Sequence, residues 1–120
     1  MRRGFWIVAL ALVFAFQHRV DIQNWLNPPE PIKVPDGFQA VLYATEWCGY
    51  CKRTRKFFTE NNIAYREYDI EKSAEGSAQY NQLGGNGVPV VIIGDQVIHG
   101  YDEQTMREAL GQLASRNTAQ

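Results

Sequence analysis

The 120-residue chain contains two cysteines, Cys48 and Cys51, which lie three residues apart in the segment EWCGYC. Such a pair could form a structural disulfide, ligate a metal ion, or act as a dithiol that is reversibly oxidised. A structural disulfide stabilises a protein by closing a loop in the unfolded chain, and this loop is very short. A closed zinc site needs four ligands, but the two histidines, His18 and His99, have no spacing that completes the set. The sequence therefore favours the reversible redox couple.

The pattern around the pair predicts how it is positioned. Residues 38–45 are apolar and β-rich, as in a buried strand, and a run of helix-forming residues starts at Cys48. The free N–H groups and positive dipole of a helix start would stabilise a Cys48 thiolate and lower its pKa, and Cys51 follows one turn later on the same face. Four basic side chains would add positive potential, or form a solvated face: Lys52, Arg53, Arg55 and Lys56. Glu46 would oppose them if its carboxylate pointed inward.

The next segments alternate between strand and helix patterns. Residues 64–70 (AYREYDI) alternate in polarity like a second strand. A helix is then predicted from Ser73 to Gly84, with Gly76 as a weak point in its interior. We therefore expect a strand and a second helix after the cysteine-bearing helix.

The last part of the domain predicts a hairpin and a final helix. Residues 88–100 (VPVVIIGDQVIHG) contain two apolar runs around a Gly-Asp turn, which indicates an antiparallel hairpin. Asp102 can cap a closing amphipathic helix. The apolar stripe of that helix consists of Met106, Leu110 and Leu113. The order β-α-β-α-β-β-α predicts an α/β fold with a mixed four-stranded sheet, helices on both faces, and parallel first and second strands.

Pro89 is the one proline within this domain, and it stands at the start of a predicted strand. Proline is tolerated at a strand start, and a cis bond there would turn the Val88 backbone outward. The alternative is an ordinary proline that merely begins the strand.

Taken together, the segments WCGYC and GVPVVIIGDQVIHGYDE resemble the glutaredoxin branch of the thioredoxin superfamily over about residues 37–115. This resemblance implies a thioredoxin-like fold and a thiol–disulfide oxidoreductase. In that family the first cysteine is the nucleophile, so Cys48 would attack a glutathione mixed disulfide or another disulfide. A second glutathione, or Cys51, would then release the intermediate. Glutathione would be the co-substrate, and disulfide-containing or glutathionylated proteins would be the partners of a monomeric enzyme.

The resemblance also implies a groove for glutathione. Val88 and Pro89 match the family's Val–cis-Pro, where the valine backbone pairs with the cysteinyl unit like an added strand. Tyr50 would line the groove. Three residues match the loop that holds the γ-glutamyl end: Gly100, Tyr101 and Asp102. The N–H groups of the helix start suit its carboxylate, and Asp102 could meet its ammonium. For Tyr101 and Asp102 the alternatives are packing and helix capping.

Four positions depart from the usual family pattern. Thr45 stands where many glutaredoxins carry a lysine that contacts the glycyl carboxylate, and Gly49 replaces the proline of C-P-Y-C. Gly87 replaces the threonine before Val-Pro, and His99 replaces the first glycine of a Gly-Gly pair. Trp47 and Gly49 instead resemble the Trp-Cys-Gly-Pro-Cys of thioredoxin.

These departures leave three further hypotheses open. The first is a thioredoxin-like reductant or isomerase of exported proteins. The second is a glutathione-dependent [2Fe–2S] protein, in which two subunits would hold the cluster through the first cysteine of each and two glutathiones. The third is a structural domain without redox use. No metal is expected in the monomer.

The N-terminal segment differs from the rest in composition. Within residues 1–20, Arg2 and Arg3 precede an uncharged apolar run, which is typical of a signal peptide core. The run is shorter than the ~20 residues of a usual spanning helix, so a short membrane anchor extended by His18 and Arg19 is the second interpretation. A helix buried in the domain is the third. The first two predict an exported or membrane-anchored protein, which in a bacterium would lie at the inner membrane facing the periplasm, rather than a cytoplasmic one.

Composition and proline content set the remaining boundaries. Residues 21–36 contain four prolines and predict a stiff tether. Residues 37–116 would form the glutaredoxin-like domain, and residues 117–120 a disordered tail. The hydrophobic content of 45% is that of a globular protein, and the net charge of −1 offers no basic surface for nucleic acid.

Overall fold

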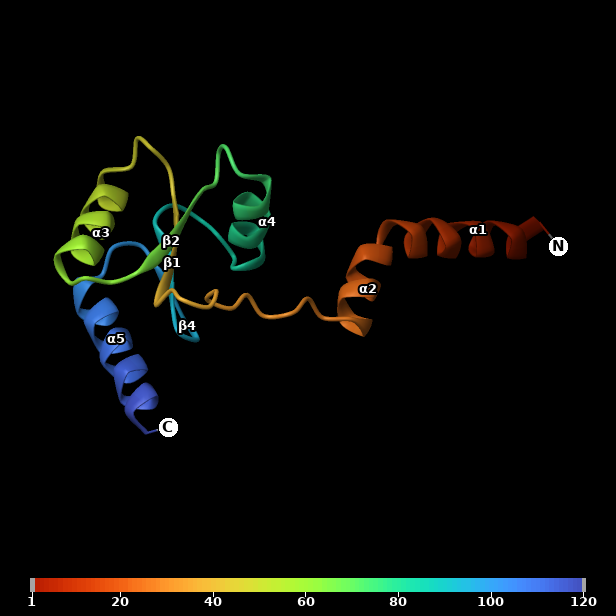
Figure 1. The fold of residues 1–120 in the computed structure, drawn as a ribbon. Helices are drawn as coiled ribbons and strands as arrows, with labels where there is room; N and C mark the ends of the chain where they lie inside the picture. The colour runs from red at the N-terminus through yellow and green to blue at the C-terminus, as the bar shows by residue number, and fades with distance from the viewer. Residues whose placement is uncertain (1, 120) are drawn as a thin grey trace. The chain divides into compact units, whose positions relative to one another are not determined.

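The computed structural model describes residues 2–119, which divide into two compact units between Pro31 and Ile32 (Figure 1). The first unit contains two helices, α1 (Arg2–Gln17) and α2 (Arg19–Leu26). Helix α1 buries none of its side chains. Within residues 2–119, every helix is too short or too polar to span a bilayer.

Helix α2 corrects the expected tether of residues 21–36, because residues 21–26 are helical. The first proline is Pro28, so nothing in the sequence before it removes a helical hydrogen bond. The other end of the expected tether also differs, because Ile32 and Val34 pack against the core of the second unit. Lys33 between them is exposed, as the alternation of an extended segment requires. Only residues 27–31 lie between α2 and the second unit.

The second unit has the predicted order of strands and helices. Its elements are β1 (Ala40–Ala44), α3 (Gly49–Glu60), β2 (Tyr65–Asp69), α4 (Ala74–Gln82), β3 (Val90–Ile93), β4 (Gln96–His99) and α5 (Glu103–Thr118). The strands lie in the order β2-β1-β3-β4. Strands β1 and β2 are parallel, and the other two pairs are antiparallel. The predicted fold class, including the hairpin, is confirmed.

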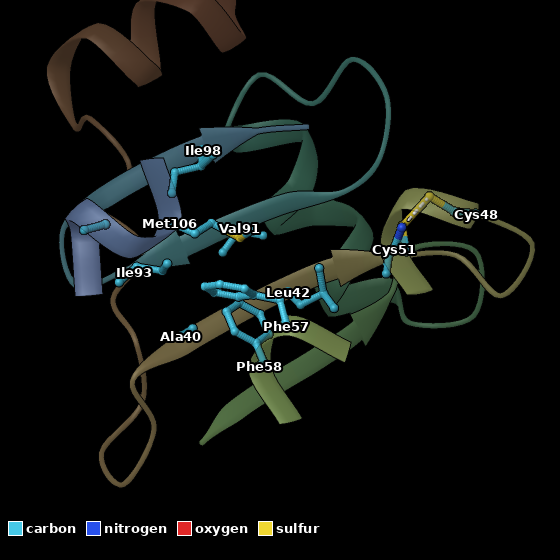
Figure 2. Close-up of a cluster of buried hydrophobic side chains, with 12 residues drawn as sticks. Ala40, Leu42, Cys48, Cys51, Phe57, Phe58, Val91, Ile93, Ile98 and Met106 are labelled. Atoms are coloured by element: carbon cyan, nitrogen blue, oxygen red, sulfur yellow. Dashed lines mark hydrogen bonds between the residues drawn. A yellow bond between two sulfur atoms is a disulfide. The ribbon is translucent and has the colours of Figure 1, made fainter. Parts of the chain in front are cut away.

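The central strand β1 is buried along its whole length and supplies side chains to both faces of the sheet. On one face, Leu42 belongs to a cluster with Phe57 and Phe58 of α3 and Met106 of α5 (Figure 2). On the other face, Val41, Tyr43, Tyr68, Val90 and Ile92 form a second cluster with residues from and after α4. The helices therefore cover both faces, as predicted.

Helix α4 corrects the prediction that Gly76 is a weak point. Gly76 is buried, and a Cβ added to it would lie 2.6 Å from Cβ of Tyr68 in β2. Its N–H donates to the Oγ of the capping Ser73 over 2.9 Å. Glycine at this position therefore allows the helix to approach the strand closely.

Helix α5 begins and packs as predicted but ends later. Asp102 is its N-cap, Met106 is fully buried, and Leu110 and Leu113 are partly buried against the first cluster. The helix continues through Thr118, whose hydroxyl donates to the carbonyl of Ala114 over 2.7 Å. The expected disordered tail of residues 117–120 is therefore helical at its first two positions, because no proline interrupts the helix before them. Gln120 lies outside the described residues.

Candidate active site

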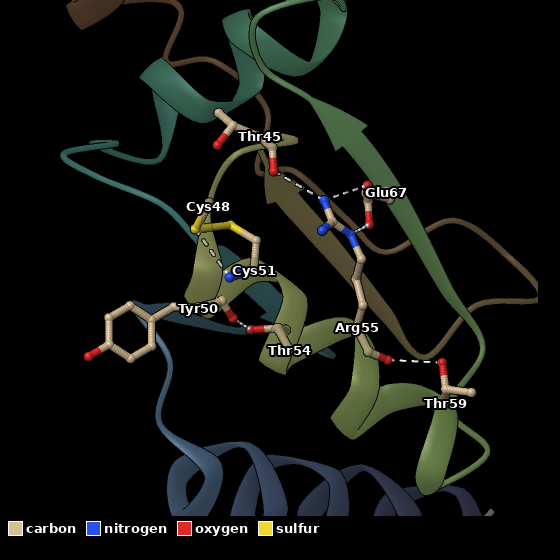
Figure 3. Close-up of polar contacts among 8 residues, drawn as sticks. All are labelled: Thr45, Cys48, Tyr50, Cys51, Thr54, Arg55, Thr59 and Glu67. Atoms are coloured by element: carbon tan, nitrogen blue, oxygen red, sulfur yellow. Dashed lines mark hydrogen bonds and ion pairs between the residues drawn. A yellow bond between two sulfur atoms is a disulfide. The ribbon is translucent and has the colours of Figure 1, made fainter.

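Cys48 is the N-cap of α3, immediately after the loop that leaves β1. Its backbone is extended (φ −76°, ψ 117°), and its Sγ accepts a hydrogen bond from the N–H of Cys51 over 3.1 Å. Cys48 and Cys51 form a disulfide with their Cα atoms 5.2 Å apart (Figure 3). Cys48 is 5% exposed and Cys51 is 0% exposed, so within this pair it is Cys48 that has surface open to solvent. The predicted strand–helix junction is confirmed.

One of the four basic side chains of α3, that of Arg55, has defined hydrogen-bond partners that the sequence did not predict. Arg55 donates through Nε to a carboxylate oxygen of Glu67 over 2.7 Å, and through Nη2 to the carbonyl of Thr45 over 3.2 Å. The hydrogen bond that Arg55 donates to Glu67 raises the pKa of Arg55 above its usual value. Arg55 therefore ties the end of β1 to β2 (Figure 3), a role that the sequence did not reveal.

Two other charged side chains near the start of α3, Glu46 and Arg53, have partners of their own. Glu46 is exposed and forms an ion pair with Lys72, which raises the pKa of that lysine. The condition under which Glu46 would oppose the thiolate, an inward-pointing carboxylate, is therefore not met. The guanidinium of Arg53 lies 5.3 Å from the ring centre of Tyr50, where a cation and an aromatic face attract each other.

Val88 and Pro89 are joined by a cis peptide bond, which confirms the prediction at this position. The carbonyl oxygen of Val88 lies 3.7 Å from Sγ of Cys48, although the two residues are forty positions apart. Gly100 lies next to them, because its N–H donates to the carbonyl of Pro89 over 2.8 Å. The fold therefore brings four predicted site residues together at one end of the sheet.

Tyr50 and Tyr101 form an aromatic pair next to the motif. Their ring centres are 6.4 Å apart and their planes differ by 22°. Tyr50 is exposed and borders a hollow of about 260 Å³ with Gly49 and Arg53. Tyr101 is half-buried, and its hydroxyl donates to Glu103 over 3.1 Å. Partial burial and this carboxylate raise the pKa of Tyr101.

Asp102 caps α5 in the manner that the sequence offered as an alternative to ligand binding. Its carboxylate accepts hydrogen bonds from the N–H of Thr105 over 3.1 Å and from the Thr105 hydroxyl over 2.8 Å. These bonds lower the pKa of Asp102 below its usual value. Contact between Asp102 and a ligand ammonium stays a prediction, as do the glutathione contacts of the other groove residues.

The departures from the family pattern have structural consequences. Thr45 is 2% exposed, and its Oγ1 is buried without a hydrogen-bond partner among residues 2–119, so it does not replace a solvent-facing lysine. Gly87 has φ +107°, a conformation that side-chain-bearing residues rarely adopt. A Cβ added to Gly49 would meet no atom within 4 Å, and His99 is exposed at the end of β4.

The described residues 2–119 contain no group of three or more side chains placed to hold a metal ion. An iron–sulfur cluster shared between two chains would use different geometry and stays a prediction. One contact that sequence reasoning missed is the pairing of Tyr80 with Gly87, although the run of glycines in residues 84–87 signals a loop that needs support from elsewhere.

The family model for glutaredoxin matches residues 40–98. A Mycobacterium tuberculosis protein provisionally named a glutaredoxin is 39% identical over 57 residues, which cover 46% of this chain and 68% of that protein. The crystal structure of a glutaredoxin from Archaeoglobus fulgidus has 26% identity and a TM-score of 0.54, with 62% of this chain and 88% of that chain covered. A buckwheat glutaredoxin–glutathione complex has 27% identity and a TM-score of 0.52, with 67% and 76% covered.

This chain therefore belongs to the glutaredoxin family. Family membership and the paired cysteines at the start of α3 support thiol–disulfide oxidoreductase chemistry.

Proposed function

We propose that this protein reduces glutathione mixed disulfides and other disulfides through Cys48 and Cys51. The observation that carries the proposal is the position of Cys48, whose sulfur caps α3 and lies 3.7 Å from the carbonyl of Val88. A helix start stabilises an anion, and the thiolate is the nucleophile of disulfide exchange. The relative with glutathione in its crystal structure supports glutathione as the co-substrate.

The reaction would begin from the reduced protein. The Cys48 thiolate attacks the glutathione sulfur of a mixed disulfide, and the substrate thiolate leaves and takes up a proton. The Cys48–glutathione disulfide can then be attacked by a second glutathione thiolate, which forms oxidised glutathione and regenerates the Cys48 thiolate. Alternatively, the Cys51 thiolate attacks Cys48, releases glutathione, and forms the Cys48–Cys51 disulfide seen here.

The groove residues would hold glutathione as their resemblance to the family implies. Val88 and Pro89 would pair with its cysteinyl unit, and Tyr50 would line the groove. The γ-glutamyl end would lie against Gly100, Tyr101 and Asp102.

Turnover of a glutathionylated substrate by the full chain, in the presence of glutathione, tests the proposal. Cys48→Ser should reduce turnover to background because it removes the nucleophile. Cys51→Ser should retain activity because glutathione can resolve the intermediate. Unchanged turnover in Cys48→Ser would refute the proposed mechanism.

A second candidate function keeps the chemistry but changes the electron donor to a protein dithiol. The observation that favours it is Thr45, a buried and uncharged residue at the position of the family's carboxylate-binding lysine. Comparing turnover with glutathione and with a reduced thioredoxin-like donor separates the two functions. Faster turnover with the protein donor would identify a thioredoxin-like reductant.

We also propose that the first unit exports or anchors the protein. Helix α1 has exposed apolar side chains around its axis, and Arg2 and Arg3 precede its apolar run. Its 16 residues extend about 24 Å, which is shorter than a bilayer core of about 30 Å, so flanking residues would have to reach the interfaces. Fractionation of cells that express the full chain, or a chain beginning at residue 28, tests this proposal. An unchanged distribution after truncation would refute it.

A further inference from the structure

The loop between α4 and β3 reaches the reactive sulfur with few side chains of its own to hold it. Gly84 and Gly87 have positive φ angles of +71° and +107°, and Gly85 stands between them. The loop ends at Val88, whose carbonyl lies 3.7 Å from Sγ of Cys48. A glycine-rich loop loses much conformational entropy when it becomes ordered, so its position depends on contacts from outside.

Tyr80 of α4 supplies such contacts to the loop. Its hydroxyl accepts a hydrogen bond from the N–H of Gly87 over 2.8 Å and donates one to the carbonyl of the same residue over 3.0 Å. A Cβ on Gly85 would collide with the Tyr80 ring, so the ring lies directly against this glycine. The N–H of Gly85 also donates to the carbonyl of Tyr80 over 2.9 Å.

Tyr80 is itself held by the core, because it packs against the second cluster beneath α4. One side chain thus connects the sheet face to both backbone groups of Gly87. The N–H and carbonyl of Gly87 are both bonded to the Tyr80 hydroxyl. A substrate bound along the loop would therefore form its backbone hydrogen bonds with Val88, the next residue. Val88 is also held by its own side chain, which packs against the first cluster, and by the hydrogen bond from Gly100 to Pro89, while Tyr80 holds the loop on its other side.

We propose that Tyr80 is a positioning residue that holds the loop of residues 84–88, and with it Val88, against an incoming substrate disulfide. This inference rests on the proposed function. Tyr80 does not touch the reacting sulfur and acts through Gly87. Its loss should therefore weaken the binding of substrate without changing the chemistry at Cys48.

Tyr80→Phe in the full chain tests the inference because it keeps the ring against Gly85 and removes the hydroxyl. We expect KM for a glutathione mixed disulfide to rise about three- to tenfold, the effect of losing one or two hydrogen bonds, with kcat within about twofold. The exchange rate of the Gly87 amide with solvent should rise by a similar factor. The pH dependence of Cys48 alkylation should stay unchanged.

Tyr68→Phe is the matched control. It removes another tyrosine hydroxyl from the same sheet face, one that donates to Glu75 over 3.2 Å and does not touch the loop. This variant should keep the KM and the Gly87 exchange rate of the wild type. An equal rise of KM in both variants would overturn the inference, because it would reflect a general loosening of this face.

An unchanged KM in Tyr80→Phe would also overturn the inference. A wild-type protein without turnover would instead refute the proposed function. In that case the exchange rate still decides whether Tyr80 holds the loop, and an unchanged Gly87 exchange rate in Tyr80→Phe would refute that role independently of activity.

Discussion

Helices α3 and α5 begin with the same type of side-chain cap, but the capping atoms belong to different chemical groups. In each, an extended N-cap residue accepts a hydrogen bond from the backbone N–H three residues later, over 3.1 Å in both cases. The cap of α5 is the carboxylate of Asp102, and the cap of α3 is the sulfur of Cys48. An N-cap side chain is a common way to stabilise a helix. When the capping atom is a cysteine sulfur, the same position can also take part in disulfide exchange.

The two capping residues differ in solvent exposure and in the number of carboxylates near them. Asp102 is exposed, and Glu103 adds a second carboxylate to the first turn of α5. Cys48 is almost fully buried, and the first turn of α3 contains no acidic residue. A thiolate at Cys48 therefore meets no neighbouring carboxylate within its helix start.

Replacing Cys48, the cap of α3, should have the largest effect on turnover. Cys48→Asp would make α3 start like α5, so turnover should fall to background while the helix keeps a capping group. Cys48→Ala should be equally inactive and, in the reduced state, less stable by about 1 kcal/mol because it lacks a cap. Turnover assays and denaturant unfolding of both variants under reducing conditions test this. Residual activity in Cys48→Asp would show that Cys48 is not the nucleophile.

An isolated second unit needs Ile32 and Val34 for its full stability, because both side chains pack against the second cluster. A chain that begins at residue 36 should lose about 2 kcal/mol of unfolding free energy relative to one that begins at residue 31. The reason is the loss of two partly buried aliphatic side chains. Chemical denaturation of the two chains measures the difference. Equal midpoints would mean that these side chains do not support the sheet.

The third helix start, that of α4, tests whether packing or capping limits stability. Gly76→Ala should destabilise the protein by about 2 kcal/mol, because the new Cβ would lie too close to Tyr68. Gly111→Ala in α5 is the matched control, since its Cβ would meet no atom within 4 Å. That variant should be more stable by about 0.5–1 kcal/mol through helix propensity. A stabilising effect of Gly76→Ala would contradict the described packing.

The smallest expected effect is a pH dependence that belongs to α5. The pKa of Asp102 is lowered by its hydrogen bonds with Thr105, and that of Glu103 by its hydrogen bond with Arg107. Both carboxylates therefore contribute stability above about pH 4.5, and this contribution is lost as the pH falls through their lowered folded-state pKa values. Unfolding measured between about pH 2 and 6 should show a shallower slope in Asp102→Asn than in the wild type. Identical slopes would contradict the assigned cap.

Local sequence signals predicted much of this molecule. The strand–helix junction at Cys48, the helix start at Ser73 and the cap at Asp102 depend on residues within a few positions, so one sequence was sufficient. The cis bond at Pro89 was one of two options until the structure showed it, and its place beside Cys48 followed from the family resemblance.

The contacts that the sequence did not predict join residues far apart in the chain. Arg55 was placed among four cations acting on the sulfur, but its partners are Glu67 and the carbonyl of Thr45. Gly76 looked unfavourable because only the fold reveals Tyr68 against it. The pattern of one sequence indicates periodicity and local chemistry, but it does not indicate which distant residues will contact each other in the fold.

The most direct test of this account is the rate of Cys48 alkylation as a function of pH. It should be measured in the reduced full chain carrying Cys51→Ser, which keeps the backbone N–H that caps the sulfur. The account predicts a thiol pKa clearly below the value of about 8.5 for an ordinary cysteine. A pKa at or above that value would contradict the claim that the start of α3 holds the sulfur as a thiolate.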